Sequence, residues 1–404
     1  MIDPIQPLST MTADDLSPEE QLRYARQMVL PEVGAEGQRK LRRASVLVIG
    51  AGGLGAPALL YLAAAGVGRL GIIDPDRVEL SNLQRQVLYD ATDCGGVKVE
   101  QARQHLLALN PNLRIDVYPE AFTLANAAGL IAAYDLAIEG SDRFATKYLV
   151  NDACVLAGNK PYIGASIRSF AGMLAVYAAP SGPCYRCLFP EMPDPATVPS
   201  CAQAGVLGTL PGLFGVLQAH EALKWILGIG EPLVGALLTV DLLTMRFQKL
   251  RLPRDPHCPV CGDTPAIDTL AETGWACAAQ AADAADEASA EDAAISADGL
   301  PWLSVAASRR RPSLRWLDIR TRAEFDAGHV PGAEHAPLDR LDRFAERVAS
   351  TTGEFLLYCQ GGARTVRAYA LLGQRLPGRL WLLRGGYDAW LRDRLATTAP
   401  NDGR

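Results

Sequence analysis

The sequence of 404 residues lacks any apolar run close to the roughly 18 residues of a membrane-spanning helix. No basic stretch followed by an apolar one stands within the first 20 residues, so we expect no secretory signal and a cytoplasmic location. The pattern G-x-x-x-x-G-K-[ST] is also missing, which disfavours ordinary P-loop chemistry. The net charge is −6, and although residues 309–404 carry an excess of positive charge, we interpret it as ordinary solvated surface and expect neither a nucleic acid nor a membrane as partner.

The composition, 49% hydrophobic and 21% charged, is that of a globular protein, and the length indicates two domains. Nine cysteines are present. In a reducing compartment they are better explained as metal ligands or reactive thiols than as disulfides.

A glycine-rich turn follows the apolar run 46–49, which is typical of a parallel strand covered on both faces. Its glycines are Gly50, Gly52, Gly53 and Gly55. Such a turn lets the backbone approach a phosphate at the N-terminus of the helix that follows. A second strand, 70–74, ends at Asp74, where an acidic side chain meets ribose hydroxyls. The pattern predicts a nucleotide site in an α/β, Rossmann-like domain, but by itself it suits NAD as well as ATP.

Further polar residues stand around this turn. Lys98 begins a predicted helix that stops at Asn110-Pro111, and Asp142 follows the predicted strand 136–139. Because ligands bind at the carboxyl ends of parallel strands, Asp74 and Asp142 should face one crevice. Near the N-terminus, Ser17 and Pro18 begin a predicted helix that carries residues 22–27, with Arg26 among them.

The residues around the turn resemble the MoeB/ThiF family, relatives of the ubiquitin-activating enzymes, over about residues 17–262. The matching features are the glycine turn, Asp74 with Asp76, the run 81–86 (Ser-Asn-Leu-Gln-Arg-Gln), Lys98 and Asp142. The resemblance implies ATP as cofactor, adenylation of the C-terminal carboxylate of a small protein, and a homodimer. One departure is Arg143, where the family usually has Asn.

The resemblance also implies roles for single residues. Asp74 would bind ribose, Arg85 and Lys98 would hold the phosphates, and Asp142 would serve Mg²⁺. Asp76 and Asn82 belong to the same nucleotide site, and Arg26 resembles an arginine that reaches the ATP of the dimer partner. Attack of a carboxylate on a phosphate brings two anions together, so such a site needs fixed positive charge. A nicotinamide oxidoreductase, the alternative, would need no such cluster.

Two C-x₂-C pairs lie about 70 residues apart. They are Cys184 with Cys187 and Cys258 with Cys261. Four thiolates match a closed, structural Zn²⁺ site, which would hold the fold together without catalysing. The alternative is two redox or disulfide pairs.

Cys201 lies in a proline-rich loop. In the family, a cysteine at the matching place can link covalently to the activated carrier or resolve a disulfide. The alternative is a small buried thiol, which is also our interpretation of Cys94, Cys154 and Cys277.

The C-terminal part contains a thiol at the end of the predicted strand 355–358. Cys359 opens a glycine-rich loop before a helix, where inward amides stabilise an anion on sulfur, and Arg364 adds charge. This stretch resembles a single rhodanese domain over residues 300–395, with Cys359 as the sulfur-carrying residue. Phosphatases share the fold, but only four residues separate Cys359 from Arg364, which favours sulfur over phosphate.

Together these features predict an α/β protein in which a Rossmann-like adenylyltransferase domain with structural zinc is joined to a smaller α/β rhodanese domain. The segments expected are a disordered N-terminus (1–16), the adenylyltransferase domain (17–262), an acidic Ala-rich linker (263–298) and the rhodanese-like domain (299–404).

We expect ATP-dependent adenylation of a ubiquitin-like sulfur carrier ending in Gly-Gly, followed by sulfur transfer from a Cys359 persulfide to give a thiocarboxylate. The persulfide donor would be a protein such as a cysteine desulfurase. The full pattern looks closest to the molybdopterin-synthase group, with thiamin, tRNA-thiolation and cysteine synthesis as alternatives. Another alternative is an activating enzyme whose rhodanese domain serves only for docking.

Overall fold

The computed structural model describes residues 16–192, 205–271, 294–295, 300–348 and 352–398. The chain divides into two compact units, Met1–Ala276 and Cys277–Arg404. Nearly all of the predicted disordered N-terminus, Cys201, Cys277 and most of the predicted linker lie outside the described residues. Among the described helices, none combines the length and the apolar character that crossing a membrane requires.

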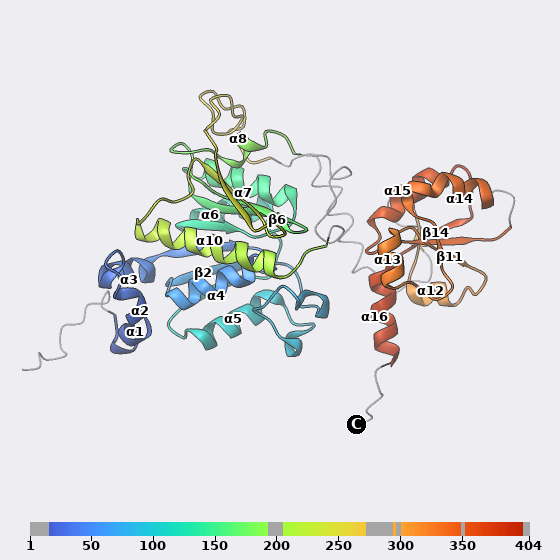
Figure 1. Cartoon of the computed structure of the whole chain (residues 1–404), viewed down its shortest axis with the longest axis horizontal. Coiled ribbons are helices and arrows are strands. Elements are labelled where there is room, and N and C mark those ends of the chain that lie inside the picture. Colours follow the sequence, from blue (N-terminus) through green and yellow to red (C-terminus); the bar gives the residue numbers. More distant parts are fainter. Residues whose placement is uncertain (1–15, 193–204, 272–293, 296–299, 349–351, 399–404) are drawn as a thin grey trace, which may run out of the picture. The chain divides into compact units, whose positions relative to one another are not determined.

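The first unit is built on an eight-stranded sheet in the order β3-β2-β1-β4-β5-β6-β7-β8 (Figure 1). The strands are β1 (Ser45–Ile49), β2 (Arg69–Ile73), β3 (Arg114–Tyr118), β4 (Leu136–Glu139), β5 (Tyr162–Arg168), β6 (Ala171–Tyr177), β7 (Ala236–Asp241) and β8 (Arg246–Arg251). Strands β1 to β5 pair in parallel and β6 to β8 continue the sheet in antiparallel fashion. The strand order reverses between β1 and β4. Such a switch point is where open α/β sheets bind ligands.

Helices cover both faces of this sheet. One face carries α4 (Gly55–Ala65), α5 (Lys98–Leu109) and α10 (Thr209–Leu227), and the other carries α6 (Leu124–Ala132) and α7 (Phe144–Leu156). Side chains of β1 alternate between the hydrophobic cores on the two faces. Val46 and Val48 belong to the core under α4, α5 and α10, and Leu47 and Ile49 belong to the core under α6 and α7. The prediction of a strand covered on both faces is confirmed.

The N-terminal segment forms α1 (Pro18–Arg23), α2 (Ala25–Met28) and α3 (Gly34–Arg43). Ser17 caps α1 as predicted, but the single helix expected through residue 27 is wrong. The helix breaks at Tyr24, which is buried and whose hydroxyl accepts a hydrogen bond from Asn110 at 2.8 Å. Tertiary packing of this tyrosine overrides the local helical pattern.

The second unit has a six-stranded sheet in the order β12-β11-β13-β14-β10-β9. Its strands are β9 (Ala294–Ile295), β10 (Pro301–Leu303), β11 (Arg315–Asp318), β12 (Glu334–His335), β13 (Phe355–Tyr358) and β14 (Leu380–Leu383). Its helices are α12 (Val305–Arg309), α13 (Arg322–Ala327), α14 (Leu341–Val348), α15 (Ala363–Leu372) and α16 (Gly386–Thr398). Phe355 and Leu357 face the core with α14 and α15, whereas Leu356 and Tyr358 face α12 and α16. Strand β9, within the segment predicted as a linker, pairs with β10.

Candidate functional site

The glycine turn joins β1 to α4 and packs its backbone against the loop that follows β4. A Cβ atom at Gly55 would lie 1.9 Å from the carbonyl oxygen of Gly50, and one at Gly50 would lie 3.0 Å from the carbonyl of Gly140. Gly50 also has a φ angle of +93°, which favours glycine. Both positions therefore require glycine, in line with the predicted tight turn.

Asp74 follows β2 and lies buried beside this turn. One carboxylate oxygen accepts a hydrogen bond from the Ala51 N–H at 2.8 Å, and the other accepts one from the Asp76 N–H at 2.9 Å. Burial raises the pKa of Asp74, and the charge of Lys98 opposes this rise. Asp74 thus ties the end of β2 to the glycine turn.

Lys98 begins α5, as predicted, and its side chain is buried next to two carboxylates. Its Nζ lies 2.7 Å from Oδ2 of Asp76 and 3.9 Å from Oδ1 of Asp74. A cation is therefore held at the carboxyl end of β2, beside the glycine turn.

The segment that begins with the 3₁₀ turn η1 (Leu80–Asn82) brings Arg85 to the glycine turn. The Cγ atom of Arg85 lies 3.5 Å from the place that a Cβ of Gly53 would occupy, and its guanidinium donates to the Ser81 carbonyl at 3.0 Å. Asn82 is buried, and its side-chain oxygen accepts from the Glu79 N–H. Arg85 is therefore a cation near the turn with no carboxylate partner among the described residues.

Asp142 lies in the loop after β4 and is exposed. Because β2 and β4 flank β1 and run parallel to it, Asp74 and Asp142 both follow carboxyl ends of strands on the same side of the sheet. That the two acids face one crevice stays a prediction. Arg143, also exposed, is the N-cap residue of α7.

A buried ion pair at the end of β4 was not predicted from the sequence. The carboxylate of Glu139 is bound by Lys147 of α7 and accepts a hydrogen bond from the Ser141 N–H at 2.8 Å. Gln218 of α10 donates to the Glu139 carbonyl at 2.7 Å. These contacts hold the loop that carries Asp142. The sequence signal that could have indicated this ion pair is Glu139, an acid at the end of an otherwise apolar strand.

Arg26 lies on α2 and is exposed. It has no hydrogen-bond or ion-pair partner in the part of the chain that the structure describes. No hydrogen bond or ion pair among the described residues joins Arg26 to the glycine turn of its own chain.

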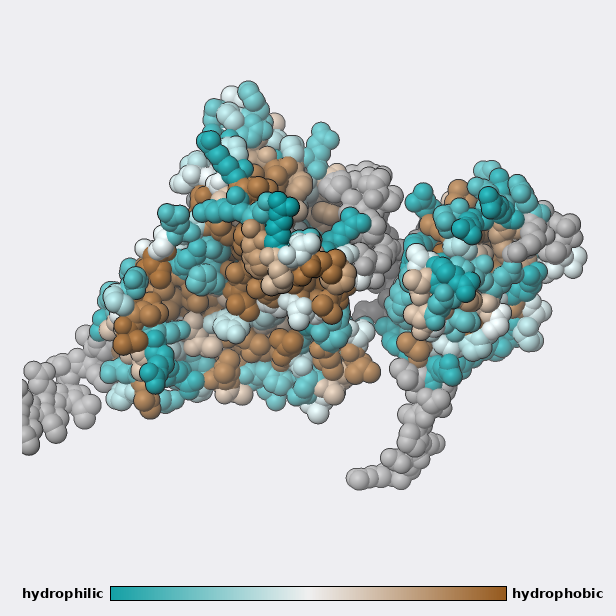
Figure 2. Space-filling view, in the orientation of Figure 1, coloured by the Kyte–Doolittle hydropathy of each residue, from teal (hydrophilic) through white to brown (hydrophobic). Residues whose placement is uncertain are grey.

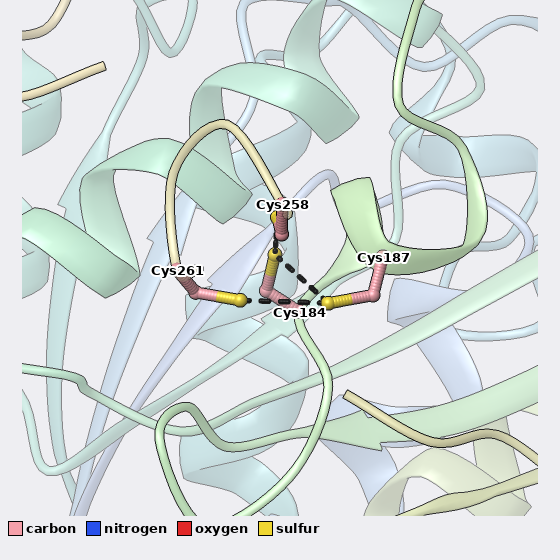
Figure 3. A group of neighbouring side chains, drawn as sticks. All are labelled: Cys184, Cys187, Cys258 and Cys261. Atoms are coloured by element: carbon pink, nitrogen blue, oxygen red, sulfur yellow. Dashed lines mark hydrogen bonds between the residues drawn. The ribbon is translucent and has the colours of Figure 1, made fainter. Parts of the chain in front are cut away.

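The four cysteines of the two C-x₂-C pairs converge, as predicted, although they come from distant segments (Figure 3). The sulfur atoms of Cys184 and Cys258 lie 3.5 Å apart, those of Cys187 and Cys261 3.4 Å, and those of Cys184 and Cys187 4.0 Å. Four thiolates at about 2.3 Å from a tetrahedral zinc ion lie roughly 3.8 Å from one another, so the cluster fits this ion.

Hydrogen bonds among the four cysteines shift the pKa values of their thiols in different directions. The hydrogen bond with Cys184 lowers the pKa of Cys187 to about 6 and also lowers the pKa of Cys258. The hydrogen bonds with Cys187 and Cys258 raise the pKa of Cys184 and, although the bond with Cys184 opposes it, they also raise that of Cys261. Thiolate is the form of cysteine that ligates metals.

The first cysteine pair is anchored by an arginine within it. Arg186, in α8 (Tyr185–Leu188), makes a buried bidentate ion pair with Asp152 of α7 at 2.8 and 2.7 Å. Arg254 steadies the second pair by donating to the Cys261 carbonyl. Contacts of Arg186 and Arg254 thus hold the two cysteine pairs in place without a metal ion.

The remaining cysteines differ in exposure. Cys154 is buried, as our interpretation required, but Cys94 is exposed, so describing it as a buried thiol was wrong. Cys94 lies at the surface because it follows the short 3₁₀ turn η2 (Ala91–Asp93) outside both cores.

In the second unit, Cys359 directly follows β13, in the loop that leads to α15. Its sulfur accepts a hydrogen bond from the Gly362 N–H at 3.1 Å, and Gly362 has a φ angle of +105°. An inward amide and a helix N-terminus therefore face the sulfur, as predicted.

Two arginines beside this loop are already engaged by carboxylates. Arg364 binds Glu324 in a bidentate manner at 2.9 and 2.6 Å. Arg320 is paired with Asp318 and also donates to the Gln360 side chain at 2.8 Å. Gln360 is therefore held in place by an internal hydrogen bond.

Comparison with known proteins identifies both units. A model of the ThiF family matches residues 24–260, and a model of the Rhodanese-like domain matches residues 304–393. The chain is 42% identical over 387 residues to the "Probable adenylyltransferase/sulfurtransferase MoeZ" of Mycobacterium tuberculosis, covering 94% of this chain and 95% of that protein. It is 43% identical to the "Adenylyltransferase and sulfurtransferase MOCS3" of Sus scrofa, covering 84% of this chain and 74% of that protein.

The first unit alone has a further relative. The "Sulfur carrier protein adenylyltransferase" of Thermus thermophilus is 56% identical over 252 residues, which are 61% of this chain and 93% of that protein. Among solved structures, E. coli MccB with ATP matches with a TM-score of 0.51 at 26% identity, covering 59% of this chain and 74% of that one. These similarities support an adenylyltransferase and disfavour the nicotinamide alternative.

Proposed function

This chain belongs to the ThiF family and is an adenylyltransferase with a sulfurtransferase domain, and we propose that its substrate is the C-terminal glycine of a ubiquitin-like sulfur carrier. The name of the Thermus relative supports this choice of substrate. The observation that carries the proposal is the pair of cations at the glycine turn. Arg85 reaches over Gly53 there, and Lys98 is buried beside Asp74.

In the first step, the carrier carboxylate attacks the α-phosphorus of ATP. The bond between the α-phosphorus and the bridging oxygen breaks, and pyrophosphate leaves. Arg85 and Lys98 offset the repulsion between the two anions, Asp74 orients the ribose, and Asp76 and Asn82 complete the nucleotide site with the glycine turn. Asp142 would hold Mg²⁺, which neutralises phosphate charge when bound.

In the second step, the outer sulfur of a Cys359 persulfide attacks the acyl-adenylate carbonyl and AMP leaves. A thiol then attacks the Cys359 sulfur of the resulting acyl disulfide, so that the thiocarboxylate departs and the two thiol sulfurs become a disulfide. Cys201, if it takes part, would either carry the acyl group before this step or supply that thiol. The Gly362 amide at the Cys359 sulfur supports an anion there.

The four-cysteine cluster would bind a structural zinc ion. No coordination position would remain open for substrate, so the ion would hold the two knuckles together and not catalyse. The convergence of four sulfurs within 4.8 Å of one another supports this assignment.

We also propose a homodimer in which Arg26 reaches the nucleotide of the second copy. Hydrophobic residues gather on the face of the first unit over α10 (Figure 2). Half-buried apolar side chains of this helix include Leu213, Leu217, Leu223, Trp225 and Ile226. A second copy covering this face would remove them from water.

The carrier we favour is that of molybdopterin synthesis, with thiamin, tRNA-thiolation or cysteine synthesis as alternatives. The persulfide donor would be a protein of the cysteine desulfurase kind.

The test is ATP–pyrophosphate exchange with a panel of small carriers ending in Gly-Gly. Exchange should depend on one carrier, on Mg²⁺ and on its terminal glycine, and a carrier with a blocked C-terminus should be inactive. Absence of exchange with every carrier, under conditions where ATP binds, would contradict the proposal.

A further inference from the structure

Gln86 is buried, but its side-chain amide makes no hydrogen bond with the described residues. The residue is only 4% exposed, and its amide oxygen is shielded from water without a partner. Gln218 also has a buried amide oxygen without a partner, but its Nε2 donates to the carbonyls of Glu139 and Ile163 at 2.7 and 3.1 Å, whereas Nε2 of Gln86 has no acceptor among the described residues. The Gln86 amide therefore makes no hydrogen bond that would hold the described part of the fold together.

The amide lies at the glycine turn. Nε2 of Gln86 is 3.6 Å from the place that a Cβ of Gly52 would occupy, just as the next side chain, Arg85, lies over Gly53. The Gly52 carbonyl accepts from the Ala56 N–H in the first turn of α4, so Gln86 stands beside the N-terminus of that helix. Two consecutive side chains therefore reach over two consecutive glycines.

Burying an amide without a hydrogen-bond partner destabilises the folded protein. A bound ligand, ion or water molecule is one explanation for such a group in a native structure. The ligand expected at a glycine turn before a helix is a phosphate, whose oxygens only accept hydrogen bonds. Of the two ends of the amide, Nε2 is the donor, has no acceptor among the described residues and faces the turn, so the phosphate would satisfy Nε2 and not the shielded Oε1.

We propose that Gln86 contacts the nucleotide, with Nε2 donating to a phosphate oxygen of ATP at Gly52. The inference rests on the proposed function, since it needs ATP in this crevice. Gln86 adds a neutral donor beside the cation of Arg85, which fixes the position of the phosphate chain without adding charge.

Full-length Gln86→Met and Gln86→Glu proteins test this assignment. Methionine keeps the volume but removes the donor, so we expect an unchanged or higher thermal midpoint without nucleotide, a smaller rise on adding Mg·ATP, and a KM for ATP in pyrophosphate exchange that is roughly tenfold higher or more. Glutamate places a negative charge at the phosphates and should raise KM further. Gln104→Ala, an exposed glutamine of α5, should leave both measurements unchanged.

The opposite pattern would overturn the inference. If Gln86→Met lowers the midpoint without nucleotide but leaves the ATP-induced rise and KM as in wild type, the residue is structural. A wild-type protein whose midpoint does not respond to Mg·ATP would instead overturn the proposed function and this inference with it.

Discussion

The Lys98 ammonium group lies 2.7 Å from the carboxylate of Asp76 and 3.9 Å from that of Asp74. The two acids differ in exposure, because the side chain of Asp76 is 61% exposed and that of Asp74 only 7%. A phosphate that reaches Lys98 would therefore compete with Asp76, which can turn into solvent. Asp74 stays in place, since the amides of Ala51 and Asp76 hold it.

Replacing Lys98 by methionine should lower carrier-dependent pyrophosphate exchange by about 100-fold or more, as expected for losing a positioned charge. It should also lower the thermal midpoint, because buried Asp74 is left opposite no cation. The double variant Asp74→Asn/Lys98→Met should recover part of the midpoint without recovering exchange. A Lys98→Met protein with the wild-type rate would show that this cation does not serve the phosphates.

Gly55→Ala should destabilise the first unit by roughly 1–3 kcal/mol or more, since the new methyl group would lie 1.9 Å from the Gly50 carbonyl oxygen. Gly129→Ala in α6 is the matched control, because no atom lies within 4 Å of its added Cβ. Alanine there should stabilise by about 0.5–1 kcal/mol. Urea unfolding followed by circular dichroism measures both. Equal effects of the two changes would contradict the close packing at the turn.

Cys258→Ser should remove the bound zinc, measured as metal content after extensive dialysis, and lower the thermal midpoint of the first unit. The purified wild type should contain about one zinc ion per chain, and a strong chelator should lower its midpoint in the same way. Cys94→Ser, at an exposed cysteine outside the cluster, should change neither quantity. Two disulfides and no metal in the purified protein would favour the redox alternative.

The second unit should lose stability in acid because of Glu324. Although burial opposes it, hydrogen bonds from Arg364 and Thr321 lower the pKa of this carboxyl to about 2, from an ordinary value of 4.5. The folded state thus binds this proton more weakly than the unfolded chain does. The stabilising contribution is complete above about pH 4.5 and is lost as the pH falls toward 2.

Glu324→Gln should flatten this part of the pH dependence, whereas Glu346→Gln, at an exposed position, should not. Tryptophan fluorescence of the whole chain reports on it, because four of the six tryptophans (Trp302, Trp316, Trp381 and Trp390) belong to the second unit. An unchanged acid profile in Glu324→Gln would show that the pair with Arg364 adds nothing to stability.

Cys359→Ala should leave pyrophosphate exchange at the wild-type level and abolish thiocarboxylate formation, because adenylation needs no persulfide. Mass spectrometry of the carrier distinguishes a C-terminal carboxylate from a thiocarboxylate. Cys94→Ser is again the control. Thiocarboxylate formed at the full rate by Cys359→Ala would favour the alternative in which the rhodanese-like domain only docks a partner.

Several features follow from local sequence alone. The strand before the glycine turn, the start of α5 at Lys98, the strand 136–139 and the loop at Cys359 all stand as predicted, because each depends on neighbours within one turn or strand. The two cysteine pairs met as predicted for a similar reason. Each pair lies within one short turn of the chain, and two C-x₂-C pairs with this spacing are typical of a single four-cysteine zinc site.

Only the tertiary structure shows which contacts hold these local elements in place. The break at Tyr24, the Glu139–Lys147 pair and the anchor between Arg186 and Asp152 depend on residues that are distant in sequence. The burial of Gln86 beside the glycine turn is likewise visible only in the folded chain. A polar side chain without a hydrogen-bond partner has little effect on the free energy of folding in water but destabilises the protein when it is buried. Which polar residues need a partner therefore depends on which of them folding removes from water.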